Sequence, residues 1–167
     1  MSGSTPIATR AQVLALLDGG NAYAPFDQTV ADFPVGAMNT PPPNVPYTPW
    51  HLLEHLRRTQ RDILDFMRDP AYRELAWPQD YWPARDATAT EADWQQTLDG
   101  FRADLAAIRG IVADPQTDLD SLILNAGDDP KYTVMRQALL VADHNAYHLG
   151  EFAILRQVMG TWPPDHR

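Results

Sequence analysis

Apolar side chains recur at spacings of three and four residues in several windows of the chain, and prolines or glycines separate these windows. This spacing places apolar groups on one face of a helix, and proline is excluded from helix interiors. No segment alternates apolar and polar positions convincingly, so no strand is predicted. The pattern predicts helices over residues 7–18, 49–69, 90–112 and 131–159, with a further short helix over 25–33.

The ends of the long windows carry recognisable capping residues. Thr48 is placed to cap a helix that begins at Pro49. Thr90-Glu91-Ala92-Asp93 resembles a capping box with Asp in place of Glu, and Gly160 is placed to close the last helix. The stripes expected to face the core are Leu52, Leu56, Ile63 and Met67 in one helix, and Trp94, Leu98, Phe101, Leu105 and Ile108 in the next. We therefore predict an all-α fold, a four-helix up-and-down bundle with at least one long connection.

Two segments between the helices are expected to be irregular. Residues 34–49 form a Pro-rich connector, and residues 70–89 form a loop anchored by Trp77, Tyr81 and Trp82. We expect the connector and the 77–82 segment to form the rim of any pocket. The whole chain, 1–167, is predicted to be one domain with a core over about 8–160 and a tail over 161–167.

Composition narrows the classes of function. The chain has 13 Lys and Arg against 22 Asp and Glu, a net charge of −9, and no cysteine. The negative charge weighs against binding to nucleic acids or anionic membranes, and the lack of cysteine excludes disulfides and thiolate nucleophiles. No segment approaches the roughly 18 apolar residues of a membrane span, and the N-terminal residues do not resemble a signal peptide. We expect a cytoplasmic protein with no nucleic-acid or membrane partner.

Four of the five histidines form two pairs at i, i+4, namely His51 with His55 and His144 with His148. Side chains four residues apart lie on the same helix face, so both imidazoles of a pair can reach one metal ion. The second pair shares a stripe with apolar residues, where a shared ion would satisfy two imidazoles that are costly to bury unpaired. Hydrogen-bonded core histidines are the alternative. His166 is expected to be exposed.

The first pair could supply a third ligand, because packed helices lie about 8–10 Å apart. Three histidines with an open position are typical of a catalytic metal site, but spacing does not choose between His51 and His55. Glu151 lies three residues after His148, so it could be a further ligand, a hydrogen-bond partner of an imidazole, or a base. The HExxH motif of zinc peptidases and the ExxH sets of di-iron bundles are absent.

Other polar residues near the histidines are given less specific roles. Glu54 and Asp143 are expected at the surface, and Tyr147 could line a pocket mouth. Arg156 is the only basic residue near the second pair, so the sequence offers no anchor for a large anionic thiol.

Two motifs together resemble the DinB/YfiT-like superfamily. His55-Leu56 matches the His-Leu pair of the family, and the segment from His144 to Glu151 matches its HxxxHxGQ signature, with Glu151 in place of the usual Gln. The resemblance covers about residues 8–159. It implies a four-helix bundle, here with an extra N-terminal helix and the Pro-rich connector, and one divalent metal held by His55, His144 and His148. His51 then becomes a pocket-lining residue.

The resemblance also implies a range of functions. Family members include thiol-dependent S-transferases, a thiol-dependent isomerase and metal-dependent hydrolases, and many are homodimers. We therefore expect a homodimeric metal-dependent enzyme that acts on a small molecule, with a low-molecular-weight thiol as a candidate partner and Glu151 as the candidate catalytic base. Zn or Ni are the first candidates for the ion, followed by Fe, Mn or Cu. The alternatives are a non-catalytic metal-binding or stress-response protein and a purely structural helical dimer.

Overall fold

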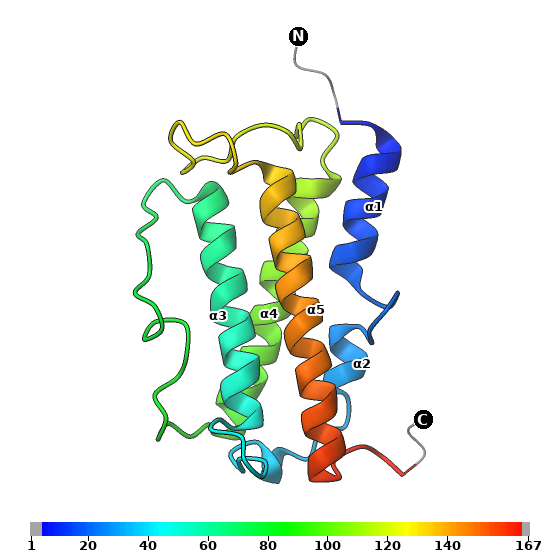
Figure 1. Cartoon of the computed structure of the whole chain (residues 1–167), viewed down its shortest axis with the longest axis vertical. Helices are drawn as coiled ribbons and strands as arrows, with labels where there is room; N and C mark the ends of the chain where they lie inside the picture. Colours follow the sequence, from blue (N-terminus) through cyan, green and yellow to red (C-terminus); the bar gives the residue numbers. More distant parts are fainter. Residues whose placement is uncertain (1–4, 165–167) are drawn as a thin grey trace.

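The computed structural model describes residues 5–164, and within this range the chain is helical with no strand. Three long helices lie side by side: α3 (Pro49–Arg68), α4 (Glu91–Ala113) and α5 (Val134–Met159) (Figure 1). The shorter α1 (Ile7–Asp18) and α2 (Phe26–Val30) follow one another along the side of α5. The predicted all-α fold is therefore confirmed. His166, expected to be exposed, lies outside the described residues.

The predicted helix starts are confirmed by their caps. The Thr48 hydroxyl accepts a hydrogen bond from the His51 N–H, and Thr90 and Asp93 form the reciprocal pair of a capping box. Helix α5 begins at Val134 rather than near 131, because the Thr133 side chain caps it. The short helix predicted over 25–33 is limited to Phe26–Val30, and the Pro-rich connector contains one 3₁₀ turn, Val35–Ala37.

The core has two halves stacked along the long helices. One half gathers Ile63, Leu64, Ile108 and Val141 with Val13 and Leu17 of α1. The other gathers Leu52, Leu56, Phe101 and Phe152 with Phe26 and Val30 of α2 and Phe33 beyond it. The predicted stripes of α3 and α4 are buried, with Leu105 partly so. Thus α1 covers one half of the core and α2 with the connector covers the other.

Helix α5 is rotated slightly from the predicted orientation. Its buried stripe includes Val141, Asn145 and Leu149, whereas His144 and His148 are half-buried at the edge of that stripe. The two histidines therefore border the core on the side that packs against α3, rather than pointing into its centre.

Glu54 was expected at the surface, and that prediction is wrong. Its side chain is buried and accepts hydrogen bonds from Arg57, Arg58 and the Thr97 hydroxyl. These donors compensate the carboxylate for the water that it loses on burial. Asp143 is exposed, as predicted.

Arg156 is fully buried and has a structural role. Its guanidinium donates to the carbonyl oxygens of Thr29, Ala31 and Thr161 and lies 3.9 Å from the ring centroid of Trp162. It therefore ties the segment around α2 and the segment after α5 to α5 itself. None of the described helices is long and apolar enough to cross a membrane.

Candidate metal centre

Helices α3 and α5 bring three of the predicted residues together. His55 comes from α3, and His144 and His148 come from α5; one ring nitrogen of each lies within 4.8 Å of those of the other two. The Nε2 atoms of His55 and His144 are 3.3 Å apart. Nitrogens that each lie about 2.0–2.1 Å from an ion in tetrahedral geometry are about 3.4 Å from one another. The three histidines could therefore hold a metal ion.

Contacts on the far side of two imidazoles fix the direction of their lone pairs. The Nδ1 of His55 lies 3.1 Å from the carbonyl oxygen of Tyr81, and the Nδ1 of His148 lies 2.7 Å from Oε2 of Glu151. Carbonyl and carboxylate oxygens accept hydrogen bonds, so each Nδ1 carries a hydrogen, and in the neutral ring the Nε2 then presents a lone pair. Metal-binding histidines show this arrangement, which holds the ring and its tautomer in place.

The electrostatic surroundings keep the buried imidazoles neutral. Burial is the main cause that lowers the pKa of His55 to about 4 and that of His144 to about 3. The neighbouring His148 contributes to both shifts, and the hydrogen bond with the Tyr81 carbonyl partly opposes the shift of His55. A neutral imidazole is the form that binds a metal. His55 and His144 are therefore in their ligating state at neutral pH without having to lose a proton.

Aromatic rings from the predicted 70–89 loop cover this cluster. The indole of Trp82 stacks on His55 with a centroid distance of 3.9 Å and an interplanar angle of 6°. Trp77 makes an edge contact with the same imidazole, although Trp77 itself is largely exposed. Stacking on one side and the Tyr81 carbonyl on the other leave His55 little freedom to rotate.

Glu151 is the hydrogen-bond partner of an imidazole, one of the three roles considered for it. One carboxylate oxygen accepts from His148 and the other accepts from the hydroxyl of Tyr47, which belongs to the Pro-rich connector. Burial alone would raise the pKa of Glu151, but these two hydrogen bonds lower it below its usual value. The carboxylate is therefore ionised at neutral pH and linked to His148.

His51 stands apart from the cluster, as the resemblance implied. Its Nδ1 accepts from the backbone N–H of Thr48, and its Nε2 lies 2.9 Å from the carbonyl oxygen of Ala87. Both ring nitrogens are thus occupied within the protein. His51 nevertheless lines a cavity, so its predicted place beside a pocket is confirmed.

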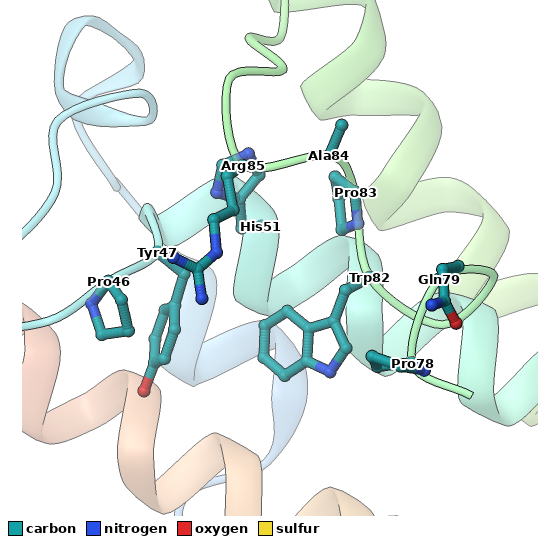
Figure 2. Close-up of a pocket in the computed structure, with 9 residues that line it drawn as sticks. All are labelled: Pro46, Tyr47, His51, Pro78, Gln79, Trp82, Pro83, Ala84 and Arg85. Atoms are coloured by element: carbon teal, nitrogen blue, oxygen red, sulfur yellow. The ribbon is translucent and has the colours of Figure 1, made fainter.

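A cavity of 460 Å³ lies where the connector meets the 77–85 loop (Figure 2). The two segments predicted as rims both line it, and the lining residues are Pro46, Tyr47, His51, Pro78, Gln79, Trp82, Pro83, Ala84 and Arg85. Two of the lining residues connect the cavity to the histidine cluster, because Tyr47 contacts Glu151 and Trp82 contacts His55. A second cavity of 410 Å³ shares Tyr47 and includes Glu151 and Tyr147, which places Tyr147 in a pocket wall as predicted.

The sequence did not predict the contacts that loop residues make with the site. Tyr47, the Tyr81 carbonyl and Arg85 were not singled out, because a loop has no periodicity that tells which groups face the core. The concentration of Trp77, Tyr81 and Trp82 in one short loop was the one available signal. Arg156 was considered as the basic residue nearest the motif, but its guanidinium is used within the fold, whereas Arg85 lines the cavity.

Comparison with known proteins gives one match. The family model of the DinB superfamily matches residues 20–152. No curated protein and no solved structure matches the chain. The matched range includes α3 and all three clustered histidines.

Proposed function

The chain belongs to the DinB superfamily, and from this premise we propose that it is a metal-dependent enzyme acting on a small molecule, with one divalent ion held by His55, His144 and His148. The observation that carries the proposal is the pair of contacts behind the imidazoles. Tyr81 orients His55 and Glu151 orients His148, so that ring nitrogens from two helices gather within 4.8 Å. Zn and Ni are the first candidates because both accept imidazole ligands.

The helical arrangement is proposed to be the four-helix bundle that the resemblance implies. Helix α1 packs on α4 and α5, and α2 packs on α5. We assign these two short helices jointly to the fourth position, beside the long helices α3, α4 and α5 (Figure 1).

An ion held by three imidazoles has an open coordination position and acts as a Lewis acid that lowers the pKa of a water or thiol bound there. The chain's own residues supply the rest. Glu151 keeps the hydrogen on Nδ1 of His148, and Tyr47 fixes the carboxylate by donating to its other oxygen. We propose Glu151 as the group that takes up a proton during the reaction, because its carboxylate is hydrogen-bonded to His148 beside the proposed ion.

Hydrolysis and thiol transfer are the two reaction types proposed, and they are separable by assay. Purified protein loaded with Zn²⁺ would be tested for hydrolysis of 4-nitrophenyl acetate, and for transfer of cysteine to 1-chloro-2,4-dinitrobenzene. The His148→Ala variant is the control for both reactions. Turnover that requires His148 would support the enzyme proposal. Stoichiometric metal binding without turnover in either assay would favour the non-catalytic metal-binding alternative.

A homodimer is proposed from the family resemblance and from one exposed surface. Tyr147, Ile154 and Val158 lie on one side of α5, with 71%, 66% and 58% of their surfaces exposed. Large apolar groups that share a surface favour contact with a protein partner. Light scattering coupled to size-exclusion chromatography would give the mass, and Ile154→Glu should reduce the dimer fraction if this surface forms the interface.

Cytoplasmic location and the lack of nucleic-acid or membrane partners stay predictions from composition.

A further inference from the structure

We propose that Arg85 anchors the carboxylate of a small molecule with a flat apolar body in the 460 Å³ cavity beside the histidine cluster. The proposal names the class of ligand for the cavity that adjoins the histidine cluster. It rests on the proposed function for whether that ligand is a substrate, but not for its binding.

Arg85 is a cation without a partner in the part of the chain that the structure describes. It is exposed, lines the cavity, and forms no ion pair or hydrogen bond within residues 5–164. Figure 2 shows its side chain extending over the cavity toward the space between Tyr47 and Trp82. Five other arginines pair with nearby carboxylates: Arg57, Arg58, Arg61, Arg102 and Arg109. Arg68, Arg73 and Arg136 are also unpaired among the described residues, but none of them lines this cavity. The chain has a net charge of −9, so an unpaired guanidinium at a cavity is a local positive charge that attracts an anion to that cavity.

The residues that line the cavity indicate the shape and polarity of the part of the ligand that is not charged. The rings of Tyr47 and Trp82 have centroids 5.4 Å apart and are tilted by 39°, and three prolines also line the cavity, together with His51, Gln79 and Ala84. Aromatic and proline surfaces favour a flat apolar group, and an arginine fork binds a carboxylate through two parallel hydrogen bonds. The volume lies within the range of about 300–1,000 Å³ for small-molecule sites.

The surroundings favour a singly charged carboxylate over a phosphate. The cavity is close to the start of α3, but the first N–H groups of that helix are already used. Trp50 donates to the Met38 carbonyl, His51 donates to the Thr48 hydroxyl, and Pro49 has no N–H. Among residues 5–164, Arg85 is also the only Lys or Arg that lines this cavity. A dianion would therefore find a single cation and no free helix amide, whereas one guanidinium matches one carboxylate.

The anchored molecule would lie against the walls that touch the histidine cluster. Trp82 contacts His55 by stacking, and the Tyr47 hydroxyl donates to Glu151. The side chains of Tyr47 and Trp82, which contact the cluster, would therefore lie between the cluster and a ligand held at Arg85. Arg85 is a binding residue in this proposal and takes no part in the reaction itself.

The test compares naphthalene-2-carboxylate with the neutral naphthalene-2-carboxamide, using calorimetry on the full chain in Zn²⁺-loaded and metal-free forms. We expect the carboxylate to bind more tightly, in both forms. Arg85→Ala should weaken carboxylate binding by about tenfold or more, because it removes the guanidinium that would pair with the carboxylate. Binding of the carboxamide should not change. Arg85→Lys should retain part of the preference, because it keeps the charge but loses the fork.

Arg136→Ala is the matched control, because it removes the same charge from an exposed arginine of α5 that does not line the cavity. Carboxylate affinity that is equal in wild type and Arg85→Ala would overturn the inference, as would equal affinity for the two probes or no binding of either. Carboxylate binding that needs Zn²⁺ but not Arg85 would overturn it too, while supporting the metal site. Arg85-dependent binding in a protein that never takes up metal would support the inference and overturn the proposed function instead.

Discussion

The Nε2 atoms of His55 and His144 face each other at 3.3 Å, from two different helices. Since the Nδ1 hydrogen of His55 is directed at the Tyr81 carbonyl, its Nε2 presents a lone pair toward His144. A neutral hydrogen bond from His144 would satisfy that lone pair, but it would leave the Nε2 of His148 without a hydrogen-bond partner among the described residues. A cation would satisfy the Nε2 lone pairs of His55 and His148 at once.

The first prediction concerns the ligand set. His148→Ala should abolish stoichiometric metal binding while the helical content stays unchanged, because the side chain is half-buried at the edge of the core. Metal per chain and far-UV circular dichroism would be measured on the same preparation. Full retention of metal in this variant would refute the assignment of His148.

The matched control for that variant is His51→Ala. His51 is also a histidine of α3, but both its nitrogens are occupied by backbone groups. The variant should keep its metal and lose about 1 kcal/mol of stability, the usual cost of a lost capping hydrogen bond. Loss of metal here would mean that the wrong histidine of the pair has been assigned.

The second prediction separates the two roles of Glu151. Glu151→Gln can still accept a hydrogen bond from His148, so it should retain the metal, whereas Glu151→Ala should weaken metal affinity by about 10–100-fold, as outer-shell changes do. If the carboxylate takes up a proton during turnover, Glu151→Gln should lower kcat with the metal still bound. Wild-type kcat in Glu151→Gln would leave Glu151 with a positioning role only.

The helices could be predicted from local signals, because each long helix starts at a residue whose own side chain accepts a backbone hydrogen bond. Thr48, Thr90 and Thr133 all do so, although Thr133 was not identified from the sequence. The i, i+4 pair on α5 likewise predicted a shared site, because helix geometry alone places both imidazoles on one face.

The loop contributions could not be predicted, because they depend on how the chain returns to the bundle. Nothing local to Tyr81 indicates that its carbonyl meets His55, and nothing in the connector indicates that Tyr47 meets Glu151. The burial of Glu54 did have a local signal. Arg57 and Arg58 follow it at i+3 and i+4, the spacing at which an ion pair can form on a helix.

The third prediction concerns stability remote from the site. Arg156→Met keeps most of the side-chain volume but leaves the carbonyls of Thr29, Ala31 and Thr161 without their donor. We expect a loss of about 2–4 kcal/mol in the free energy of unfolding, since unsatisfied buried polar groups are costly. Urea denaturation would measure the loss, and metal per folded chain should not change. A stability equal to wild type would contradict the structural role given to Arg156.

The fourth prediction is a pH dependence of stability from Glu54. Burial would raise the pKa of this carboxyl, but its hydrogen bonds with Arg57, Arg58 and Thr97 lower it below the ordinary value of 4.5. A carboxyl whose pKa is lower in the folded state stabilises the fold above its unfolded pKa, and this contribution is lost as the pH falls through the folded pKa. Wild type should therefore be about 1 kcal/mol more stable than Glu54→Gln at pH 7, and the difference should shrink below about pH 4.5. A difference that stays constant with pH would contradict this account.

The central claim is that His55, His144 and His148 hold a divalent metal. The most direct measurement is elemental analysis of the protein, purified without a histidine tag and without added metal, expressed per chain. The account predicts about one metal ion per chain, as a single three-histidine centre requires. A chain that contains no metal, and takes up none when Zn²⁺ or Ni²⁺ is added, would contradict it and leave the three histidines as hydrogen-bonded residues at the edge of a helical core.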